Sequence, residues 1–342
     1  MKGIVKRKEE ESSMRHLSVT RNLVQILVLS LLAAFTACRN STATPSQPVT
    51  DSQDGSSTRT EGSLPGIDID GYKLVFHDEF EGSRVDLTKW AFQSGTNIDG
   101  NPNNAWGNQE AQYYKDDNAP VSDGTLKITA KRERAEFTWD GRQYFQEYTS
   151  ARLRTHGKFS AKYGRFEARI KSPAITGLWP AFWMMPEMDI YGGWPRSGEI
   201  DIMEAKGRLP NQVGQAIHFA MPDEQHNYHH RYIHNVDNYT FPNGGRIDEF
   251  HTYRLDWSPK QMEWFVDNEL IYSVHVDSWK NNFASSQGSA DAPFDHEFHM
   301  LLNLAVGGMF DEHKLPSEDF VSAAMEIDYV RVWQKIGDVQ HR

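Results

Sequence analysis

Between residues 70 and 334 the chain consists of short segments in which apolar and polar side chains alternate, and MEIDYVRVWQ (325–334) is typical of them. A period of two places one set of side chains on each face of a strand, and no long stretch has the 3.6-residue period of a helix. Gly, Pro, Asn and Asp clusters separate the segments, which predicts an antiparallel all-β sandwich or barrel. In the longest segment, Asp267 and Asn268 predict a hairpin turn. The other alternating segments span 72–80, 124–133, 157–172, 180–185, 250–276 and 298–306.

Composition narrows the classes of partner. The formal net charge of −11 argues against nucleic acid or an anionic membrane surface as a partner. A neutral ligand is compatible with this charge, and the ten tryptophans supply flat apolar faces for one. The single cysteine excludes an internal disulfide. We expect a monomer.

The N-terminal region has the pattern of a secretory signal, with basic residues such as Arg15 and Arg21, an apolar run over 23–35, and small residues before Cys38. The run is too short to span a membrane comfortably as a permanent helix. The small residues directly before Cys38 resemble the end of a bacterial lipoprotein signal, in which the cysteine becomes the lipidated first residue. We therefore predict a signal peptide over 1–37. An ordinary secretory signal with an incidental cysteine is the alternative.

Residues 38–65 are polar, rich in Ser and Thr and almost free of aliphatic side chains, so they predict a flexible tether. A folded domain is then expected at 66–336, followed by a tail at 337–342. Arg39 is not the Asp that retains some lipoproteins at the inner membrane. We expect a protein that is secreted across the inner membrane and lipid-anchored at the outer membrane or cell surface of a bacterium.

Residues 199–204, EIDIME, carry three acids on a segment with the composition of a strand. Glu199 and Asp201 share a face because side chains two apart point the same way, whereas Glu204 has the wrong parity. A β-bulge adds one residue to a strand and resets the parity, and bulges are common beside active sites. We therefore predict a bulge near Met203 that turns all three acids to one side.

Three interpretations of this acid cluster compete. A solvated strand face is disfavoured by Ile200 and Ile202, which require a core behind the strand. A metal site needs clustered oxygen ligands, and three acids along one flat face form a poor cage. In a glycosidase, one Glu attacks the anomeric carbon and the other protonates the leaving oxygen, and neighbouring negative charge raises the pKa of that acid. The spacing favours this third interpretation.

The EIDIME segment, with its extra Met, resembles the catalytic signature of glycoside hydrolase family 16 in the form typical of its laminarinase branch, the endo-β-1,3-glucanases and β-1,3(4)-glucanases. The resemblance covers most of residues 70–334, in family order. The segments that carry it are YKLVFHDEF, WGNQEAQYY, YTSARLRTHGKFSAKYGRFEARIK, GLWPAFWMMP, GWPRSGEIDIMEAKGR, QAIHFA, FHTYRLDWSP, NLAVGG and MEIDYVRVW.

The resemblance implies a β-jelly-roll sandwich of two curved antiparallel sheets, concanavalin A-like, with a catalytic cleft on the concave face. It implies an endo-acting, retaining hydrolase of laminarin-type or mixed-linkage β-glucan, with Glu199 as nucleophile, Asp201 assisting and Glu204 as acid/base. It implies no cofactor for catalysis. Three alternatives stay open: a family 16 hydrolase of a galactan such as agar, porphyran or carrageenan, a transglycosylase, and a non-catalytic β-glucan-binding protein.

Further site residues also follow from the resemblance, because aromatic rings stack on sugar faces while amides and Arg bond hydroxyls. Trp179 and Trp194 are implied as the best sugar platforms. Asn108 and Arg152 match positions that bond sugars on the nonreducing side of the cut. His218 matches a His near the catalytic site, with a core histidine as the alternative. The candidate substrate-binding residues are Trp106, Asn108, Arg152, Trp179, Trp183, Trp194 and His218, whereas Trp90, Trp257, Trp264 and Trp333 are expected in the core.

The resemblance also implies a structural Ca²⁺ away from catalysis, at Glu79, the Gly124 backbone and Asp328. Two acids and a carbonyl, completed by water, suit a hard cation. Without the resemblance, Asp328 would be taken as a surface residue.

Two segments beside the expected cleft, 223–235 and 309–311, differ from the rest of the pattern. Residues 223–235 hold four histidines, and a metal site is one interpretation because His is a common ligand. The spacing lacks a regular presentation of three His on a helix or a strand, so we expect an exposed variable loop. After NLAVGG, residues 309–311 are Met-Phe-Asp where the family commonly has Asn-Trp-Pro, so the sugar subsites at this loop depart from the family pattern.

Overall fold

The computed structural model describes residues 69–97, 99–223, 227–280 and 290–337. The predicted signal peptide 1–37, the tether 38–65 and the predicted lipidation site Cys38 lie outside the described residues. Within the described part, no helix is long and apolar enough to cross a membrane. The helical turns found there are 3₁₀ turns of three residues each, so the described chain is almost wholly β, as the alternation predicts.

Ten strands form the first sheet, and β20 (Ser322–Lys335) runs through its middle. β20 pairs with β5 at its N-terminal end, with β10 along its middle and with β1 at its C-terminal end, all antiparallel. Only β3–β8 is parallel among the described strand pairs, a departure from the predicted antiparallel sheets. The order is β18 (Glu269–His275), β17 (Gln261–Val266), β16 (His251–Trp257), β10 (Gly164–Lys171), β20, β5 (Thr125–Lys131), β8 (Tyr148–Ser150) and β3 (Gln112–Tyr114), with β1 (Tyr72–Asp78) on β20 and β4 (Val121–Ser122) on β5.

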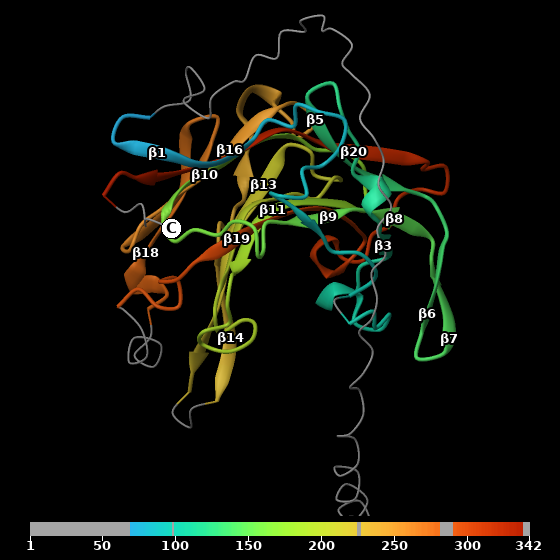
Figure 1. Cartoon of the computed structure of the whole chain (residues 1–342), viewed down its shortest axis with the longest axis horizontal. Helices are drawn as coiled ribbons and strands as arrows, with labels where there is room; N and C mark the ends of the chain where they lie inside the picture. Colours follow the sequence, from blue (N-terminus) through green and yellow to red (C-terminus); the bar gives the residue numbers. More distant parts are fainter. Residues whose placement is uncertain (1–68, 98, 224–226, 281–289, 338–342) are drawn as a thin grey trace, which may run out of the picture. The chain divides into compact units, whose positions relative to one another are not determined.

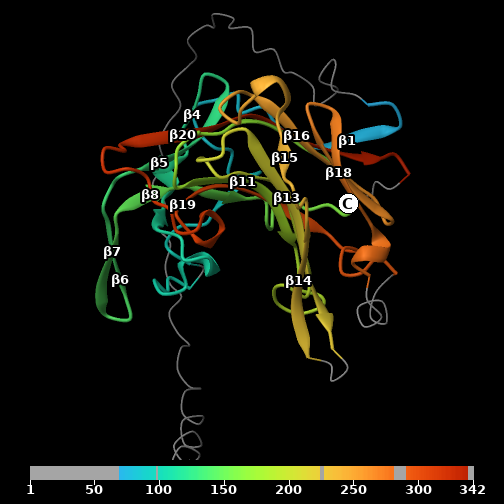
Figure 2. The ribbon, with the colours of Figure 1, turned by 180° about the vertical axis from the view of Figure 1, so that it is seen from behind.

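Eight strands form the second sheet, which packs as a layer against the first (Figures 1 and 2). This two-layer arrangement is the predicted jelly-roll sandwich. Its order is β14 (Tyr228–His234), β13 (Gln212–Pro222), β12 (Glu199–Glu204), β11 (Leu178–Pro186), β19 (Phe298–Val306), β9 (Arg152–Arg154) and β2 (Ala91–Phe92), with β15 (Tyr239–Thr240) on β13. β6 (Ala135–Trp139) and β7 (Arg142–Gln146) form a separate hairpin.

The core lies between the two sheets. Ile128 of β5 and Val330 of β20 belong to the same buried cluster as Phe182 of β11 and Leu302 of β19, and none of the four side chains is exposed. Burying one such side chain contributes roughly 1.5–3 kcal/mol, so this cluster is the main source of stability. The four predicted core tryptophans are confirmed, with exposures of 0% for Trp90, 3% for Trp257, 1% for Trp264 and 2% for Trp333.

The predicted hairpin turn is confirmed at Asp267 and Asn268, which join β17 to β18. Both residues have positive φ, 49° and 68°, as a two-residue hairpin turn with the right-handed strand twist requires. Asx residues tolerate this conformation better than most others, so the local sequence sets the turn.

The acid strand β12 contains the predicted bulge. Against β11, Asp201 pairs with Trp183 and Met203 pairs with Phe182, so Ile202 is the extra residue. Against β13, the register also shifts between Asp201 and Glu204. Ile202 and Met203 are consecutive and both lie in the core cluster, which a regular strand would not allow.

The prediction of a loop at 223–235 is wrong for most of that range. Residues 228–234 form β14, which pairs with β13 from Pro222–Tyr228 to Ala216–His234. Its side chains are exposed or half-buried on both faces, so the sequence shows no alternation of apolar and polar residues that would predict this strand. In Figures 1 and 2 this hairpin and the β6–β7 hairpin both extend beyond the second sheet, on the side away from the core.

Candidate active site

The bulge puts all three acids of β12 on the face of the second sheet that points away from the core. Ile200, before the bulge, faces the core and is fully buried, so Glu199 and Asp201 face outward. The extra residue then returns Glu204 to this outer face. The bulge frees backbone groups from the ladder, and the Asp201 carbonyl accepts a hydrogen bond of 2.9 Å from Trp264 Nε1 in the first sheet.

The residue before Glu199 must be a glycine. Gly198 has a φ of +92°, a conformation that other residues rarely adopt. A Cβ at this position would lie 2.7 Å from the Phe294 ring and 3.1 Å from the Phe298 ring. A side chain at this position would therefore have to displace the Phe294 or Phe298 ring from the core.

Two indole N–H groups donate hydrogen bonds to the carboxyl groups of Glu199 and Glu204. Trp194 Nε1 donates to Glu199 Oε2 at 2.6 Å, and Trp179 Nε1 donates to Glu204 Oε1 at 3.0 Å. Trp194 precedes β12 on an exposed turn, and Trp179 lies on the neighbouring strand β11. Each glutamate therefore has its own donor, which restricts its rotamer and orients it along the strand face.

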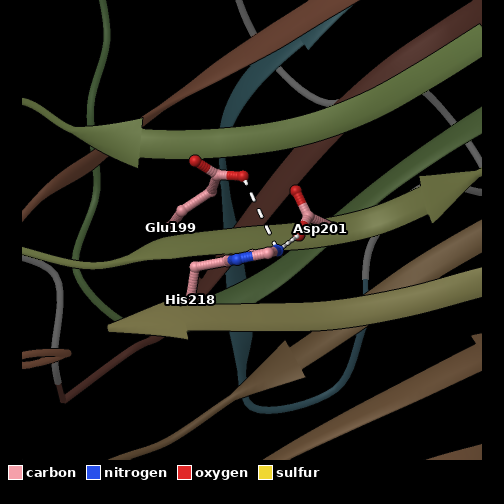
Figure 3. A group of neighbouring side chains, drawn as sticks. All are labelled: Glu199, Asp201 and His218. Carbon is pink, nitrogen blue, oxygen red and sulfur yellow. Dashed lines mark ion pairs between the residues drawn. The ribbon is translucent and has the colours of Figure 1, made fainter. Parts of the chain in front are cut away.

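His218 of β13 faces the first two acids (Figure 3). Its Nε2 lies 3.3 Å from Asp201 Oδ2 and 4.0 Å from Glu199 Oε1. On the other side, His218 Nδ1 lies 2.8 Å from Nε2 of His230, and the two rings stack at 5.1 Å. One ligand atom from each of Glu199, Asp201 and His218 lies within 4.8 Å of the others, so the group offers two oxygens and a nitrogen to a cation.

Burial raises the pKa of every acid in the cluster, and repulsion by neighbouring acids adds to this for the two glutamates. Burial, and then the charge of Asp201, raises the pKa of Glu199 to about 8, while His218, the Trp194 hydrogen bond and Arg152 act in the opposite direction. Burial also raises the pKa of Asp201. The pKa of Glu204 is raised well above its ordinary value by burial and then by the charges of Asp201 and Glu199. Both neighbouring acids raise the pKa of Glu204, whereas only Asp201 raises that of Glu199, so repulsion within the cluster favours a proton on Glu204.

Arg152 occupies one side of the acid strand, across β11 and β19. Its guanidinium carbon lies 4.6 Å from the centre of the Trp106 ring and 4.8 Å from that of Trp183. Its Nε donates to Gln93 Oε1 at 2.7 Å, and burial lowers its pKa. The structure therefore brings together three of the predicted substrate-binding residues, and it adds Gln93, which the sequence did not single out.

A buried network of hydrogen bonds links Asn108 to Trp183 on the same side of the acid strand as Arg152. Glu110 accepts hydrogen bonds from Gln112 Nε2 at 2.6 Å and Tyr114 Oη at 3.0 Å, and the predicted site residue Asn108 approaches it at 3.4 Å. Burial raises the pKa of Glu110. The Asn303 amide continues the network: its Nδ2 donates to Tyr114 Oη at 3.3 Å, and its Oδ1 accepts from Trp183 Nε1 at 2.7 Å. A network with these partners fixes the orientation of the Trp183 ring.

The other side of the acid strand carries a depression of about 320 Å³. Glu204 and His218 border it from β12 and β13, Tyr232 from β14, and Phe310 from the 309–311 turn. The Phe310 ring also stacks on the Trp179 ring at 4.8 Å. Trp179 is only 9% exposed and one of its faces is covered, so it offers a sugar little surface, and its role as a platform stays a prediction.

Sequence reasoning missed three ring side chains at the site. His230 contacts His218, Tyr232 borders the depression, and Phe310 covers Trp179. The available signal was the i, i+2, i+4 spacing of His230, Tyr232 and His234, which is the presentation of one strand face. The partner strand that makes this face part of the site could not be read from that spacing.

The residues predicted to hold calcium lie around β20. Asp78 pairs with Val330 and Leu126 pairs with Ile327, so Glu79 and Gly124 flank the position of Asp328 from two neighbouring strands. Both Glu79 oxygens accept hydrogen bonds from Arg331, at 2.9 and 2.7 Å, and Asp328 Oδ2 accepts one from Arg169 at 2.6 Å. Guanidinium groups engage both carboxylates, so a Ca²⁺ bound there would have to displace Arg331 and Arg169.

Comparisons with known proteins agree on the family. A family model described as the GH16 domain of beta-porphyranases A–D matches residues 74–335. A glucan endo-1,3-beta-glucosidase of Cryptopygus antarcticus is 40% identical over 269 residues, 76% of this chain and 91% of that protein. Glucan endo-1,3-beta-glucosidase A1 of Niallia circulans is 37% identical over 298 residues, 85% of this chain but only 41% of that longer protein. Among solved structures, the catalytic domain of an endo-1,3-beta-glucanase (laminarinase) from Thermotoga petrophila RKU-1 is similar with a TM-score of 0.64 and 34% identity, covering 78% of this chain and 98% of that one.

Proposed function

The chain belongs to glycoside hydrolase family 16, and we propose that it is an endo-acting, retaining β-glucanase that cleaves β-1,3-glucosidic bonds in laminarin-type or mixed-linkage glucans. The observation that carries this proposal is the bulged strand β12, which presents Glu199, Asp201 and Glu204 on one face with separate supports. Relatives at 37% and 40% identity are named glucan endo-1,3-beta-glucosidases, which supports the substrate class.

The proposed reaction uses one glutamate as an anion and the other as an acid. Glu199 acts as the anion and attacks the anomeric carbon, while Glu204 gives its proton to the leaving glycosidic oxygen. A glycosyl ester on Glu199 and a free sugar hydroxyl result. Water then attacks the anomeric carbon, Glu204 takes the proton from that water, and the ester bond to Glu199 breaks. Both carboxyls return to their starting states, and the anomeric configuration is retained.

The neighbouring groups favour these roles. His218, Trp194 and Arg152 each act to lower the pKa of Glu199, so they stabilise its ionised form against burial. Asp201 lies between the glutamates, and its charge helps to keep Glu204 protonated. His218 faces both Asp201 and Glu199, so it orients the nucleophile side of the cluster. The two environments thus separate the acid from the nucleophile.

A galactan is the second candidate substrate. The specific observation in its favour is that the family model matching residues 74–335 is described as the GH16 domain of beta-porphyranases A–D. The acids alone do not discriminate, because hydrolysis of either polysaccharide uses the same pair of glutamates. We prefer β-glucan because the two relatives described above are named glucan endo-1,3-beta-glucosidases and align with most of this chain.

The test is digestion of laminarin, lichenan, curdlan, agarose and porphyran by the full-length protein, with Glu199→Ser as the matched control. We expect short β-1,3-linked oligosaccharides from laminarin and none from the control. Proton NMR during the first turnovers should detect the β-anomer, as retention requires. Products from agarose or porphyran alone would contradict the substrate proposal, and binding without products would place the protein among β-glucan-binding proteins.

The proposed reaction needs no cofactor, because carboxyl groups and water carry every step. A structural Ca²⁺ at Glu79, Gly124 and Asp328 stays a prediction, and no step depends on it. Its check is calorimetric titration of the EGTA-treated protein with Ca²⁺, and heat of binding would mean that Arg331 and Arg169 release their carboxylates.

We also propose that the chain is exported and anchored by a lipid on Cys38. The support is the sequence alone, with an apolar run and small residues before the cysteine. Expression in a bacterial host should place the protein in the membrane fraction with the added mass of acyl chains, and Cys38→Ser should release it. A soluble, unlipidated wild type would contradict the anchor.

A further inference from the structure

The strand order of the second sheet assigns the two sides of the cleft. Arg152, which by resemblance bonds sugars on the nonreducing side of the cut, lies on β9, beyond β11 and β19 from the acid strand. β13 and β14 lie on the opposite side of β12. A glucan that crosses the strands over the acids therefore places its leaving-group sugars over β13 and β14. This assignment rests on the proposed function.

A sugar on this side would enter the depression beside the predicted acid, Glu204. The depression of about 320 Å³ mixes ring surfaces with polar side chains, as a sugar site requires. Tyr232 and Phe310 supply the rings. The polar lining includes Lys206, Gln212 and Asn238, which can bond sugar hydroxyls.

Tyr232 is the ring in the depression that presents the most surface. It pairs directly with His218 across the β13–β14 ladder, so both side chains lie on the face that carries the acids. Its ring stacks against His218 at 5.8 Å with an interplanar angle of 25°, and the His234 ring supports it at 5.1 Å. Despite these contacts, 58% of Tyr232 remains exposed, so its side chain is open to a ligand.

We infer that Tyr232 is the stacking platform for the sugar on the leaving-group side of the cut. The pyranose ring of a β-glucan has apolar C–H faces that pack on an aromatic ring, and its hydroxyls point to the polar rim of the depression. Three histidine rings, those of His218, His230 and His234, surround the Tyr232 ring and restrict it, so sugar binding costs little further side-chain entropy.

The platform also controls what attacks the glycosyl ester on Glu199. After the first sugar leaves, the same site can hold an acceptor sugar instead of water. The acceptor hydroxyl then attacks the anomeric carbon, its proton passes to Glu204, and the bond to Glu199 breaks as a new glycosidic bond forms. Tyr232 therefore raises the share of transglycosylation relative to hydrolysis.

The test compares the full-length wild type with Tyr232→Ala, Tyr232→Trp and Arg231→Ala. Arg231 is the matched control, because it neighbours Tyr232 on β14, is exposed, and points to the other face. Each variant digests laminarihexaose in H₂¹⁸O with laminaribiose as added acceptor. Hydrolysis introduces ¹⁸O into the product and transfer does not, so mass spectrometry gives the ratio directly.

For Tyr232→Ala we expect kcat/KM to fall by about 3- to 10-fold, the range for loss of one aromatic contact, and the transfer share to fall with it. Tyr232→Trp should restore both, and Arg231→Ala should match the wild type. The acid limb of the pH profile should not move in Tyr232→Ala, whereas a ring that merely positioned His218 would shift it. A wild-type transfer share in Tyr232→Ala, or an equal loss in Arg231→Ala, would overturn the inference.

The outcomes separate this inference from the proposed function. If the wild type cleaves only a galactan, the substrate proposal fails, and the same variants are compared with agaro-oligosaccharides under the same criteria. If the wild type cleaves neither, the hydrolase proposal fails, and titration calorimetry with laminaritetraose replaces the kinetic ratio. Weaker binding by Tyr232→Ala than by Arg231→Ala then supports the platform, and equal binding refutes it.

Discussion

Replacing Trp194 by Phe should change how the nucleophile titrates while leaving a ring in place. The indole Nε1 donates to Glu199 Oε2 at 2.6 Å, a short bond to a carboxyl that acts as an anion. This bond lowers the pKa of Glu199, which burial raises to about 8. Its removal favours the protonated form, so the pKa of Glu199 should rise further.

The size of the shift can be worked out from the bond. A hydrogen bond to a charged group contributes roughly 1.5–3 kcal/mol, and we take about half because Trp194 is half exposed to water. At 1.36 kcal/mol for each pKa unit, the acid limb of kcat/KM should move up by about 0.5 to 1 pH unit. The sign follows from the role of Glu199: it attacks as an anion, so a higher pKa removes activity at the low-pH end first.

The assay is kcat/KM for laminarin across the pH range, for wild type, Trp194→Phe and Trp139→Phe. Trp139 lies on the β6–β7 hairpin outside the acid cluster, so the same substitution there should leave the profile unchanged. The wild-type acid limb should itself be displaced upward from 4.5 toward about 8. An unmoved limb in Trp194→Phe, or a shift to lower pH, would refute the electrostatic account of the nucleophile.

Other consequences of the structure can be measured separately. Glu204→Gln should lower kcat on laminarin by about 10²- to 10⁴-fold, the contribution of a general acid, with a smaller loss on an aryl glycoside whose leaving group needs no proton; equal losses on both substrates would argue against the acid role. Gly198→Ala should destabilise the fold by roughly 1–3 kcal/mol, because its Cβ would meet the Phe294 ring, and an unchanged Tm would contradict the packing described. Zn²⁺ should inhibit competitively with laminarin, because His218 and two carboxylates present ligand atoms within 4.8 Å of one another. His218→Asn should weaken that inhibition, and noncompetitive inhibition would place the metal elsewhere.

The sequence by itself determined the features that depend on neighbours along the chain. Alternation with a period of two marked the strands, such as the segment 325–334 that lies in β20. The parity of Glu204 relative to Glu199 required an extra residue, and the bulge at Ile202 supplies it. The turn at Asp267 and Asn268 followed from residues that tolerate positive φ. Each of these is local, so spacing alone carries the information.

Tertiary structure decided which groups surround the acids. The indole donors of Trp194 and Trp179, the His218–His230 contact and the ring of Tyr232 meet β12 only because of the strand order and register of the second sheet. Tertiary structure also brings Arg331 to Glu79 and Arg169 to Asp328. The sequence positions of the two acids had been compatible with calcium. A pairing register relates residues far apart in the chain, and no pattern within a single segment specifies it. The chemistry of the acids was therefore visible in six residues, while their supports and the sugar platform depended on the folded sheet.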